Sequence, residues 1–352
     1  MRDYALIPAL VIILFSCNTH VPEECRTITV KGQQILKDIE LRYPYRIHIS
    51  DDLLLIENSD RMEPLFETYD LLSGKKLNEF GSRGNGPGEF ISRGSTFFSS
   101  EFDKLFIYEP IRNFIFYLDK GDLYLPHPQL KVFQEIDLQG FYAATLCILD
   151  SLFVVQGISR EFNRLQFHPI PDGKVFRRGA YQENLVQGNI EGIDRFRKEL
   201  TIQGPIRANN KLRRLVSAYY YSDLLEVYDL DEDRIIGSSD FAQPILRIFS
   251  GNRPNDIARI SREAKTGYTR MALVKDWIYC LYSETTVDES VNTGSFPHSS
   301  QIHVYDWDAN LVAKIVLDKP VYSITWDEKR NTILGLRSTP EFEIVRFHCP
   351  EI

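Results

Sequence analysis

Arginine and tyrosine side chains in the predicted loops are the residues of this sequence whose chemistry points most directly to recognition. A guanidinium group donates paired hydrogen bonds to a carboxylate or a phosphate, and aromatic faces suit sugars and peptide segments. The chain is acidic, with a net charge of -8, so we expect cations in such loops to be placed for recognition. Alternatively, they only solvate the rim and pair with carboxylates such as Glu109. The candidate ligand-binding residues are Arg61, Arg83, Arg112, Arg160, Tyr219, Tyr220 and Arg337.

Catalytic motifs are scarce in the sequence. It has no HExxH, no Gly-x-Ser-x-Gly and no CxxC pair, and its seven histidines are dispersed along the chain. The acidic run at residues 229–233 resembles a calcium loop but lacks the glycine spacing of one, which favours a solvated turn. We therefore predict no catalytic set, no metal site and no cofactor. The acidic composition also excludes a general nucleic-acid binder, which needs a basic surface.

A glycine-rich loop at residues 79–90 is the most unusual local sequence. Four glycines and a proline within residues 81–88 permit positive φ angles and let backbone N–H groups approach another group closely. A phosphate-binding loop would be followed by Lys-Ser or Lys-Thr and a helix, but both flanks of this loop are typical of strands. We therefore interpret it as a structural connection between two repeats.

Six continuous apolar strands, most of them introduced by a polar turn, indicate the elements that position these loops. They recur at intervals of about 45 to 65 residues, and each is followed by an alternating strand and a turn. This spacing is typical of four-stranded propeller blades. An ordinary β-sandwich is the alternative, but six repeats in register favour an all-β, six-bladed β-propeller. The apolar strands cover residues 53–56, 105–108, 152–155, 215–219, 277–281 and 332–336.

The ends of the chain predict how the ring closes. The last blade, ending near residue 347, lacks an outer strand, and residues 26–30 precede the first blade, so we expect residues 26–30 to seal the ring. If these terminal strands pair antiparallel, Cys25 and Cys349 fall within bridging distance, and we predict a disulfide in an oxidising compartment. Cys147 and Cys280 lie in apolar strands and are expected to be buried thiols.

The N-terminal residues 1–17 have the pattern of an exported lipoprotein. An apolar run of signal-peptide length, too short to span a membrane, ends at Leu14-Phe15-Ser16-Cys17. This segment resembles the bacterial lipobox, in which the cysteine is acylated, although a plain secretory signal is the alternative. We expect residues 18–25 to form a tether and residues 26–352 to form a single propeller domain.

The glycine run at residues 81–90, the lipobox-like Cys17 and the blade repeats together resemble the six-bladed β-propeller lipoproteins common in Bacteroidetes, which are related in shape to the TolB and NHL propellers. The resemblance covers residues 25–352, although only the glycine loop is locally specific. It implies a fold and an envelope location on the periplasmic side or at the outer membrane or cell surface. It carries no catalytic set.

These observations lead to a functional expectation. We expect a monomeric, lipid-anchored envelope protein that binds or scaffolds an unknown protein, peptide or glycan on the loop face around the central channel. The alternative is a propeller hydrolase or lyase that acts on a carbohydrate or lactone with carboxylates around the axis. An arginine- and tyrosine-lined channel mouth would favour binding, whereas inward-facing carboxylates and histidines would favour the enzyme.

Overall fold

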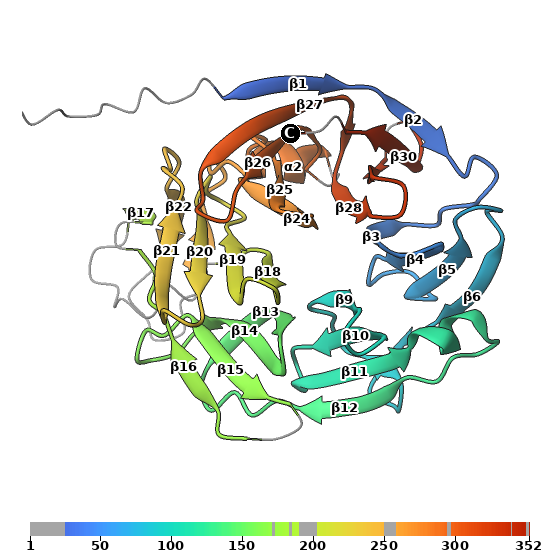
Figure 1. Cartoon of the computed structure of the whole chain (residues 1–352), viewed down its shortest axis with the longest axis horizontal. Helices are drawn as coiled ribbons and strands as arrows, with labels where there is room; N and C mark the ends of the chain where they lie inside the picture. The colour runs from blue at the N-terminus through green and yellow to red at the C-terminus, as the bar shows by residue number, and fades with distance from the viewer. Residues whose placement is uncertain are drawn as a thin grey trace, which may run out of the picture.

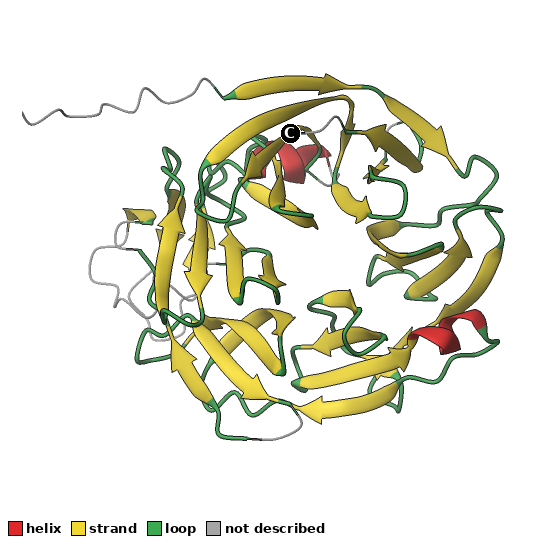
Figure 2. Cartoon of the chain, viewed as in Figure 1, coloured by secondary structure: helices red, strands yellow, loops and turns green. Residues whose placement is uncertain are grey.

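Six blades, each of four antiparallel strands, are arranged around a central axis in the computed structural model of the chain, and a fifth strand adds to one of them (Figure 1). The structure describes residues 25–170, 173–182, 185–189, 203–249, 258–293, 297–338, 340–349 and 352. Strands dominate the ring, and among the described residues one short helix lies at the outer edge of the second blade and another lies at the fifth blade (Figure 2). The prediction of an all-β, six-bladed propeller is confirmed.

The first three blades use consecutive strands, ordered from the axis outward. The first contains β3 (Pro44–Ser50), β4 (Leu53–Asn58), β5 (Phe66–Asp70) and β6 (Lys76–Phe80). The second contains β9 (Thr96–Ser99), β10 (Lys104–Glu109), β11 (Phe114–Asp119) and β12 (Lys131–Glu135), with the short helix η1 (Lys120–Tyr124) between its last two strands. The third contains β13 (Tyr142–Leu149), β14 (Leu152–Ile158), β15 (Leu165–Pro169) and β16 (Phe176–Arg178).

The other three blades complete the ring. The fourth contains β18 (Ile206–Asn209), β19 (Arg214–Ala218), β20 (Leu225–Asp229) and β21 (Arg234–Ser238). The fifth contains β24 (Tyr268–Val274), β25 (Trp277–Tyr282), β26 (Ser299–Tyr305) and β27 (Leu311–Val321), and the sixth contains β28 (Ser323–Asp327), β29 (Thr332–Arg337), β30 (Glu343–His348) and β2 (Gly32–Ile35).

Smaller elements lie outside the six blades. A three-stranded sheet has the order β17 (Val186–Asn189), β22 (Ile245–Phe249), β23 (Ala258–Ile260), and the glycine loop contains β7 (Ser82–Arg83) and β8 (Glu89–Phe90). The helix α2 (Val287–Thr293) follows the second strand of the fifth blade. No helix within the described part of the chain is long and apolar enough to cross a membrane.

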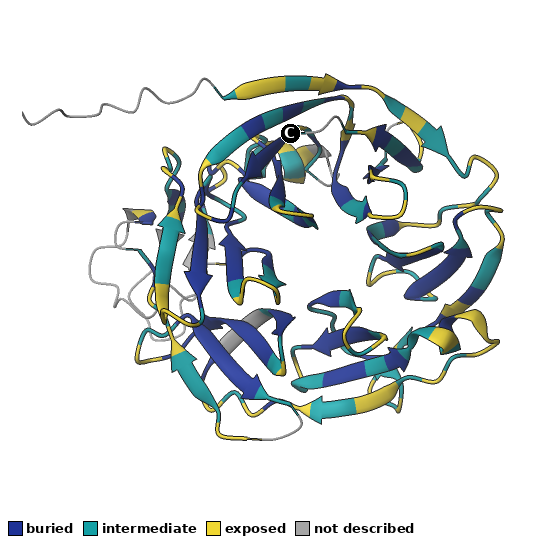
Figure 3. Ribbon diagram, viewed as in Figure 1, coloured by how far each residue is buried: buried dark blue, intermediate teal, exposed yellow. Residues whose placement is uncertain are grey.

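The core is divided into layers between neighbouring blades. One layer joins Phe106 of the second blade to Phe153 of the third, with ring centroids 5.6 Å apart. Comparable apolar layers are packed between the two blades of each other neighbouring pair. Each second strand is therefore buried on both faces, which explains why its sequence is continuously apolar (Figure 3).

The N-terminal strands occupy different places from those predicted. Strand β1 (Arg26–Val30), expected to seal the ring, instead pairs in parallel with β27 of the fifth blade. The outer place in the sixth blade belongs to β2, which is antiparallel to β30. Strand β2 approaches β30 closely, because a Cβ atom at Gly32 would lie 2.4 Å from a methyl group of Val345.

The predicted disulfide is also corrected by this arrangement. Cys25 and Cys349 are both free thiols. Because Cys25 leads into a strand that runs parallel along β27, the antiparallel pairing on which the disulfide prediction depended is absent. Cys147 and Cys280 are buried free thiols, as expected. The signal segment and the lipobox-like Cys17 lie outside the described residues.

Candidate functional site

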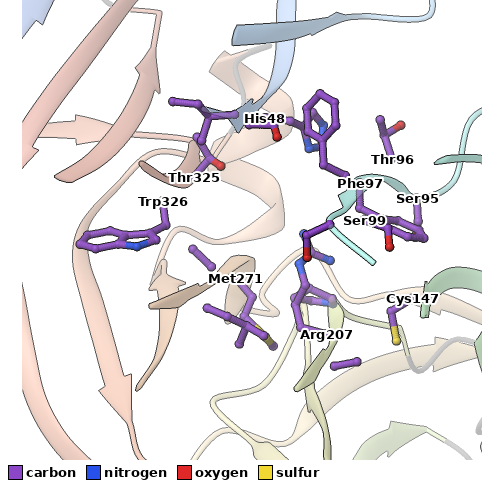
Figure 4. A pocket seen from close by; sticks show the side chains of 18 of the residues that line it. His48, Ser95, Thr96, Phe97, Ser99, Cys147, Arg207, Met271, Thr325 and Trp326 are labelled. Atoms are coloured by element: carbon purple, nitrogen blue, oxygen red, sulfur yellow. The ribbon is translucent and has the colours of Figure 1, made fainter. Parts of the chain in front are cut away.

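A central cavity of about 1140 Å³ is lined by the inner strands of all six blades. Figure 4 shows part of this lining, with side chains contributed by different blades. In each blade the inner strand runs in the same direction, from the loop face of the ring to the opposite face. The position of a residue along its inner strand therefore gives its depth in the cavity. Labelled side chains are His48, Ser95, Thr96, Phe97, Ser99, Cys147, Arg207, Met271, Thr325 and Trp326.

Three arginines stand at the loop-face end of the cavity. Arg46 is the third residue of β3, Arg207 is the second of β18, and Arg270 is the third of β24. Because these strands start at the same face, the three guanidinium groups converge on one level from three different blades. We call this group the arginine mouth.

An aromatic ring joins two members of the arginine mouth. The guanidinium carbon of Arg46 lies 4.7 Å from the centroid of the Tyr45 ring, and that of Arg270 lies 4.9 Å from it. The positive charges of Arg46 and Arg270 lower the pKa of the Tyr45 phenol from its ordinary value. Tyr220 lines the same cavity. The mouth thus combines cationic and aromatic groups.

One buried carboxylate, Glu57, lies next to the arginine mouth and pairs with Arg46. Its oxygens lie 3.6 Å from Arg46 Nη1 and 3.7 Å from Arg93 Nη1, and His48 Nε2 donates a 3.2 Å hydrogen bond to it. Burial would raise the pKa of Glu57, but the Arg46 charge, the His48 hydrogen bond and the Arg93 charge outweigh it and hold the pKa well below its usual range. Burial lowers the pKa of His48, so its imidazole is neutral near pH 7. Glu57 is therefore a fixed anion.

Arg207 and Arg270 have no comparable partner. Arg207 Nη1 donates to the carbonyl oxygen of Ile206 at 2.9 Å, and Arg270 Nη1 donates to that of Thr269 at 2.7 Å. Among the described residues, neither arginine forms an ion pair with a carboxylate. Burial lowers the pKa of Arg207, and the charges of Arg46 and Arg270 lower it further. Two cations thus share a partly buried space in which the described residues supply no carboxylate partner to either of them.

The opposite end of the cavity is balanced in charge. Its lining carboxylates all lie at or just beyond the ends of inner strands, next to lysines at the same level. Lys120 forms an ion pair with Asp51, and Arg330 bridges Asp327 and Asp52. The lining carboxylates are Asp51, Glu101, Asp103, Asp327 and Glu328, and the lysines are Lys120, Lys211, Lys275 and Lys329. The cavity is therefore polarised, with its unbalanced positive charge at the loop face.

Hydroxyl and aromatic groups line the space between the two ends. Ser99 and Thr325 present half-exposed side chains, and Phe97 and Trp326 lie at the same cavity (Figure 4). Burial raises the pKa of the Cys147 thiol to about 12, which leaves it protonated and unreactive near neutral pH. The lining thus offers hydrogen bonds and apolar faces rather than a nucleophile.

The structure brings only one of the seven predicted ligand-binding residues, Tyr220, to the cavity. Arg61, Arg83 and Arg160 are exposed in the loops where the sequence placed them, away from the cavity lining. Three others have structural partners: Arg112 Nε is 2.6 Å from Glu109 Oε2, Arg337 Nη1 is 3.4 Å from Glu343 Oε2, and the buried Tyr219 donates to Glu226. Arg112 therefore fits the alternative prediction, in which loop arginines pair with carboxylates such as Glu109.

The glycine loop is a structural connection, as interpreted from the sequence. It links β6 of the first blade to β9 of the second. Its own carboxylate, Glu89, accepts a 2.8 Å hydrogen bond from the Gly86 amide, and a Cβ atom at Gly84 would lie 1.9 Å from that carboxylate. Arg112 also donates to the Glu89 carbonyl oxygen at 2.5 Å. The backbone position that a phosphate would need is therefore filled from within the chain.

The acidic turn at residues 229–233 forms local contacts. Asp229 accepts hydrogen bonds from the amides of Asp231 and Glu232, at 2.9 and 3.0 Å, and pairs with Arg214 at 3.1 Å. Across the described residues, no cluster of three or more His, Cys, Asp or Glu side chains is placed to hold a metal ion.

The sequence did not lead us to predict the arginine mouth, because its residues lie in strands and we had ranked loops as the binding positions. A usable signal was present, however. Arg46, Arg207 and Arg270 occupy nearly the same position of the inner strand in three separate repeats. In a ring of repeats, equivalent positions come together at one level of the axis. Aligning the inner strands of the six repeats would have shown the arginines as a group.

Comparisons with known proteins indicate the same fold. The sequence model of the family described as TolB-like 6-blade propeller-like matches residues 25–329. No curated protein matches the sequence.

Three solved structures also resemble the chain, all at identities that show the fold alone. A member of the DUF4221 family from Bacteroides vulgatus has a TM-score of 0.53 and 11% identity, covering 90% of this chain and 98% of its own. A Bacteroides fragilis protein, described by inference as exported, has a TM-score of 0.50 and 10% identity over 92% and 99%. Regucalcin from Agrobacterium tumefaciens, described as a calcium-binding protein, has a TM-score of 0.50 and 11% identity over 92% and 97%.

Proposed function

Because the chain belongs to the family of TolB-like six-bladed propellers, we propose that it is a non-enzymatic binding protein of the bacterial cell envelope that holds an anionic ligand at the arginine mouth. The apolar run before Cys17 supports export and a lipid anchor. The likeness to a Bacteroides fragilis protein described by inference as exported agrees with that location.

The observation that carries the proposal is the half-buried guanidinium of Arg207, which has no carboxylate partner within the described part of the chain. A cation withdrawn from water is unfavourable unless an anion compensates it. Here the neighbouring cations Arg46 and Arg270 add repulsion. An anionic ligand bound between the three would remove the repulsion and supply the missing hydrogen-bond acceptors, because guanidinium groups pair well with carboxylate and phosphate oxygens.

The runner-up function, a hydrolase or lyase with carboxylates around the axis, has less support. Such an enzyme needs a carboxyl group that exchanges a proton with its substrate. At the arginine mouth the nearby carboxylate is Glu57, which is 1% exposed and held ionised by the cations around it. The mouth is otherwise lined by arginine and tyrosine, which favours binding over catalysis.

Calorimetric titration with small aromatic probes tests the binding function. We expect benzoate or phenyl phosphate to bind the wild-type protein and uncharged benzyl alcohol not to bind. Arg207→Met should weaken anion binding at least about tenfold, because a charge-assisted contact of this kind contributes roughly 1.5–3 kcal/mol. Arg262→Met is the matched control, since Arg262 is an exposed arginine of the loop face, paired with Asp288. Equal affinities for charged and uncharged probes would reject the proposal.

Lipid attachment is tested separately. Cells that express the chain are grown with radioactive palmitate, and we expect label on the wild-type protein and none on Cys17→Ser. An unlabelled wild-type protein would contradict the anchor while leaving the binding function intact.

A further inference from the structure

The number of charges at the arginine mouth restricts the ligand further. Arg46, Arg207 and Arg270 contribute three positive charges, and Glu57 contributes one negative charge. Arg93 also approaches Glu57, but its own charge is balanced by Asp60, whose carboxylate lies 2.6 Å from Arg93 Nη2. With His48 neutral, and counted over these described arginines and Glu57, the mouth retains an excess of two positive charges.

The described residues that line the cavity supply no further anion at this level. All five carboxylates of the lining lie at the opposite end, beyond or at the ends of the inner strands, as described above. A monoanion bound at the mouth would therefore leave one guanidinium charge uncompensated in a partly buried space.

The positions of the three arginines point to the same conclusion. They stand on the inner strands of the first, fourth and fifth blades, so they line the cavity from three different blades. A planar carboxylate has two oxygens and is matched by one guanidinium fork. A phosphate monoester has three terminal oxygens arranged around phosphorus, and two carboxylates on one molecule have four oxygens, so either can engage several forks at once.

We infer that the ligand carries a doubly charged anionic group, either a phosphate monoester or a pair of neighbouring carboxylates, which all three arginines of the mouth contact. This inference rests on the proposed anion-binding function and narrows its ligand class. The cavity of about 1140 Å³ is far larger than such a group, so the charged end belongs to a larger molecule. Its body extends along the channel past the hydroxyls of Ser99 and Thr325 and the rings of Phe97 and Trp326.

Phenyl phosphate and phenyl sulfate form the decisive pair of probes, because they have the same shape and differ by one charge at pH 8. By titration calorimetry at pH 8 we expect phenyl phosphate to bind at least about tenfold more tightly than phenyl sulfate. The second proton of a phosphate monoester has a pKa near 6, so at pH 5 the ligand is mostly a monoanion. Only about a tenth of the phenyl phosphate is then dianionic, so the affinity ratio should fall about five- to tenfold from its value at pH 8.

His48, Glu57, Tyr45, Tyr220 and Cys147 face or adjoin the mouth. At pH 5 both probes are mostly monoanions, so a change in the charge of these groups acts on both probes nearly alike. Phthalate and benzoate provide the second arm, which distinguishes paired carboxylates from a phosphate. If phthalate binds at least about tenfold more tightly than both benzoate and phenyl phosphate, the doubly charged group is a pair of carboxylates.

The variants show whether the arginine mouth is the site of this discrimination. In Arg207→Met and, separately, Arg270→Met, the ratio of phenyl phosphate to phenyl sulfate affinity should fall toward one, whereas Arg262→Met should keep it. Circular dichroism and thermal unfolding verify that each variant is folded.

The two possible failures are distinguishable. Monoanions that bind as tightly as dianions at pH 8, with binding still lost in Arg207→Met, would overturn the double charge and leave the anion-binding function standing. An absence of binding by all four probes would overturn both.

Discussion

Replacing Arg207 with methionine should stabilise the ligand-free protein even though it removes anion binding. Methionine keeps the length of the apolar stem and removes the charge. The guanidinium of Arg207 is half-buried, has no carboxylate partner among the described residues, and is repelled by Arg46 and Arg270. Its presence is therefore unfavourable for folding unless a ligand is bound.

The magnitude follows from three contributions. Two neighbouring like charges in a partly solvated cleft repel each other by roughly 1 kcal/mol. Removing the repulsion from both Arg46 and Arg270 therefore stabilises the folded protein by about 2 kcal/mol. The hydrogen bond from Arg207 Nη1 to the Ile206 carbonyl oxygen, 2.9 Å long, is lost at a cost of about 1 kcal/mol. Removing the guanidinium also removes the cost of withdrawing it from water, which stabilises the folded state. We expect a net gain of about 1 kcal/mol.

Urea unfolding of the ligand-free protein at low salt measures this gain. Because salt screens repulsion between partly exposed charges, the gain should shrink when the ionic strength is raised to 1 M. Arg46→Met is the matched comparison with the opposite sign, since it removes a cation from Glu57, which is 1% exposed, and should destabilise the fold by roughly 1–3 kcal/mol. An Arg207→Met protein less stable than the wild type would refute the reasoning.

Two further predictions concern stability. Arg112→Ala should destabilise the fold by roughly 2–4 kcal/mol in urea unfolding, because it leaves Glu109, which is fully buried, without its partner and frees the glycine loop; an unchanged midpoint would contradict this role. Burial lowers the pKa values of His168 and His303 from 6.5 to about 4, so the unfolded chain binds more protons between pH 6.5 and pH 4 and stability falls as the pH drops through that window. The loss between pH 7 and pH 4.5 is about 2 kcal/mol for each histidine, and the double variant His168→Phe, His303→Phe should lose correspondingly less, whereas an identical pH profile would contradict the assignment.

The fold could be predicted from the sequence because each blade repeats one local rule. A strand such as Leu53–Asn58 is buried on both faces between neighbouring blades, so its apolar residues are continuous and easily recognised. The closing strand could not be assigned in this way. Strands β1 and β2 are both short and partly polar, and the choice between them depends on contacts with β27 and β30, which lie near the other end of the chain.

The candidate site was missed for a related reason. Loops were ranked as binding positions by their composition, but a loop arginine such as Arg112 serves a buried carboxylate, and Arg61 stays in solvent. Arg46 and Arg270 look like ordinary polar positions of their strands. Only closure of the ring brings three such positions together, with one carboxylate beside Arg46, and no local sequence pattern indicates that charge balance.

A diffraction experiment tests the account most directly. Crystals soaked with tungstate, a heavy dianion, give an anomalous difference map that locates bound anions without assumptions about the natural ligand. The account predicts the strongest peak at the arginine mouth, in contact with Arg207, and its disappearance in Arg207→Met crystals. Peaks confined to exposed loop arginines, with none at the mouth, would contradict it.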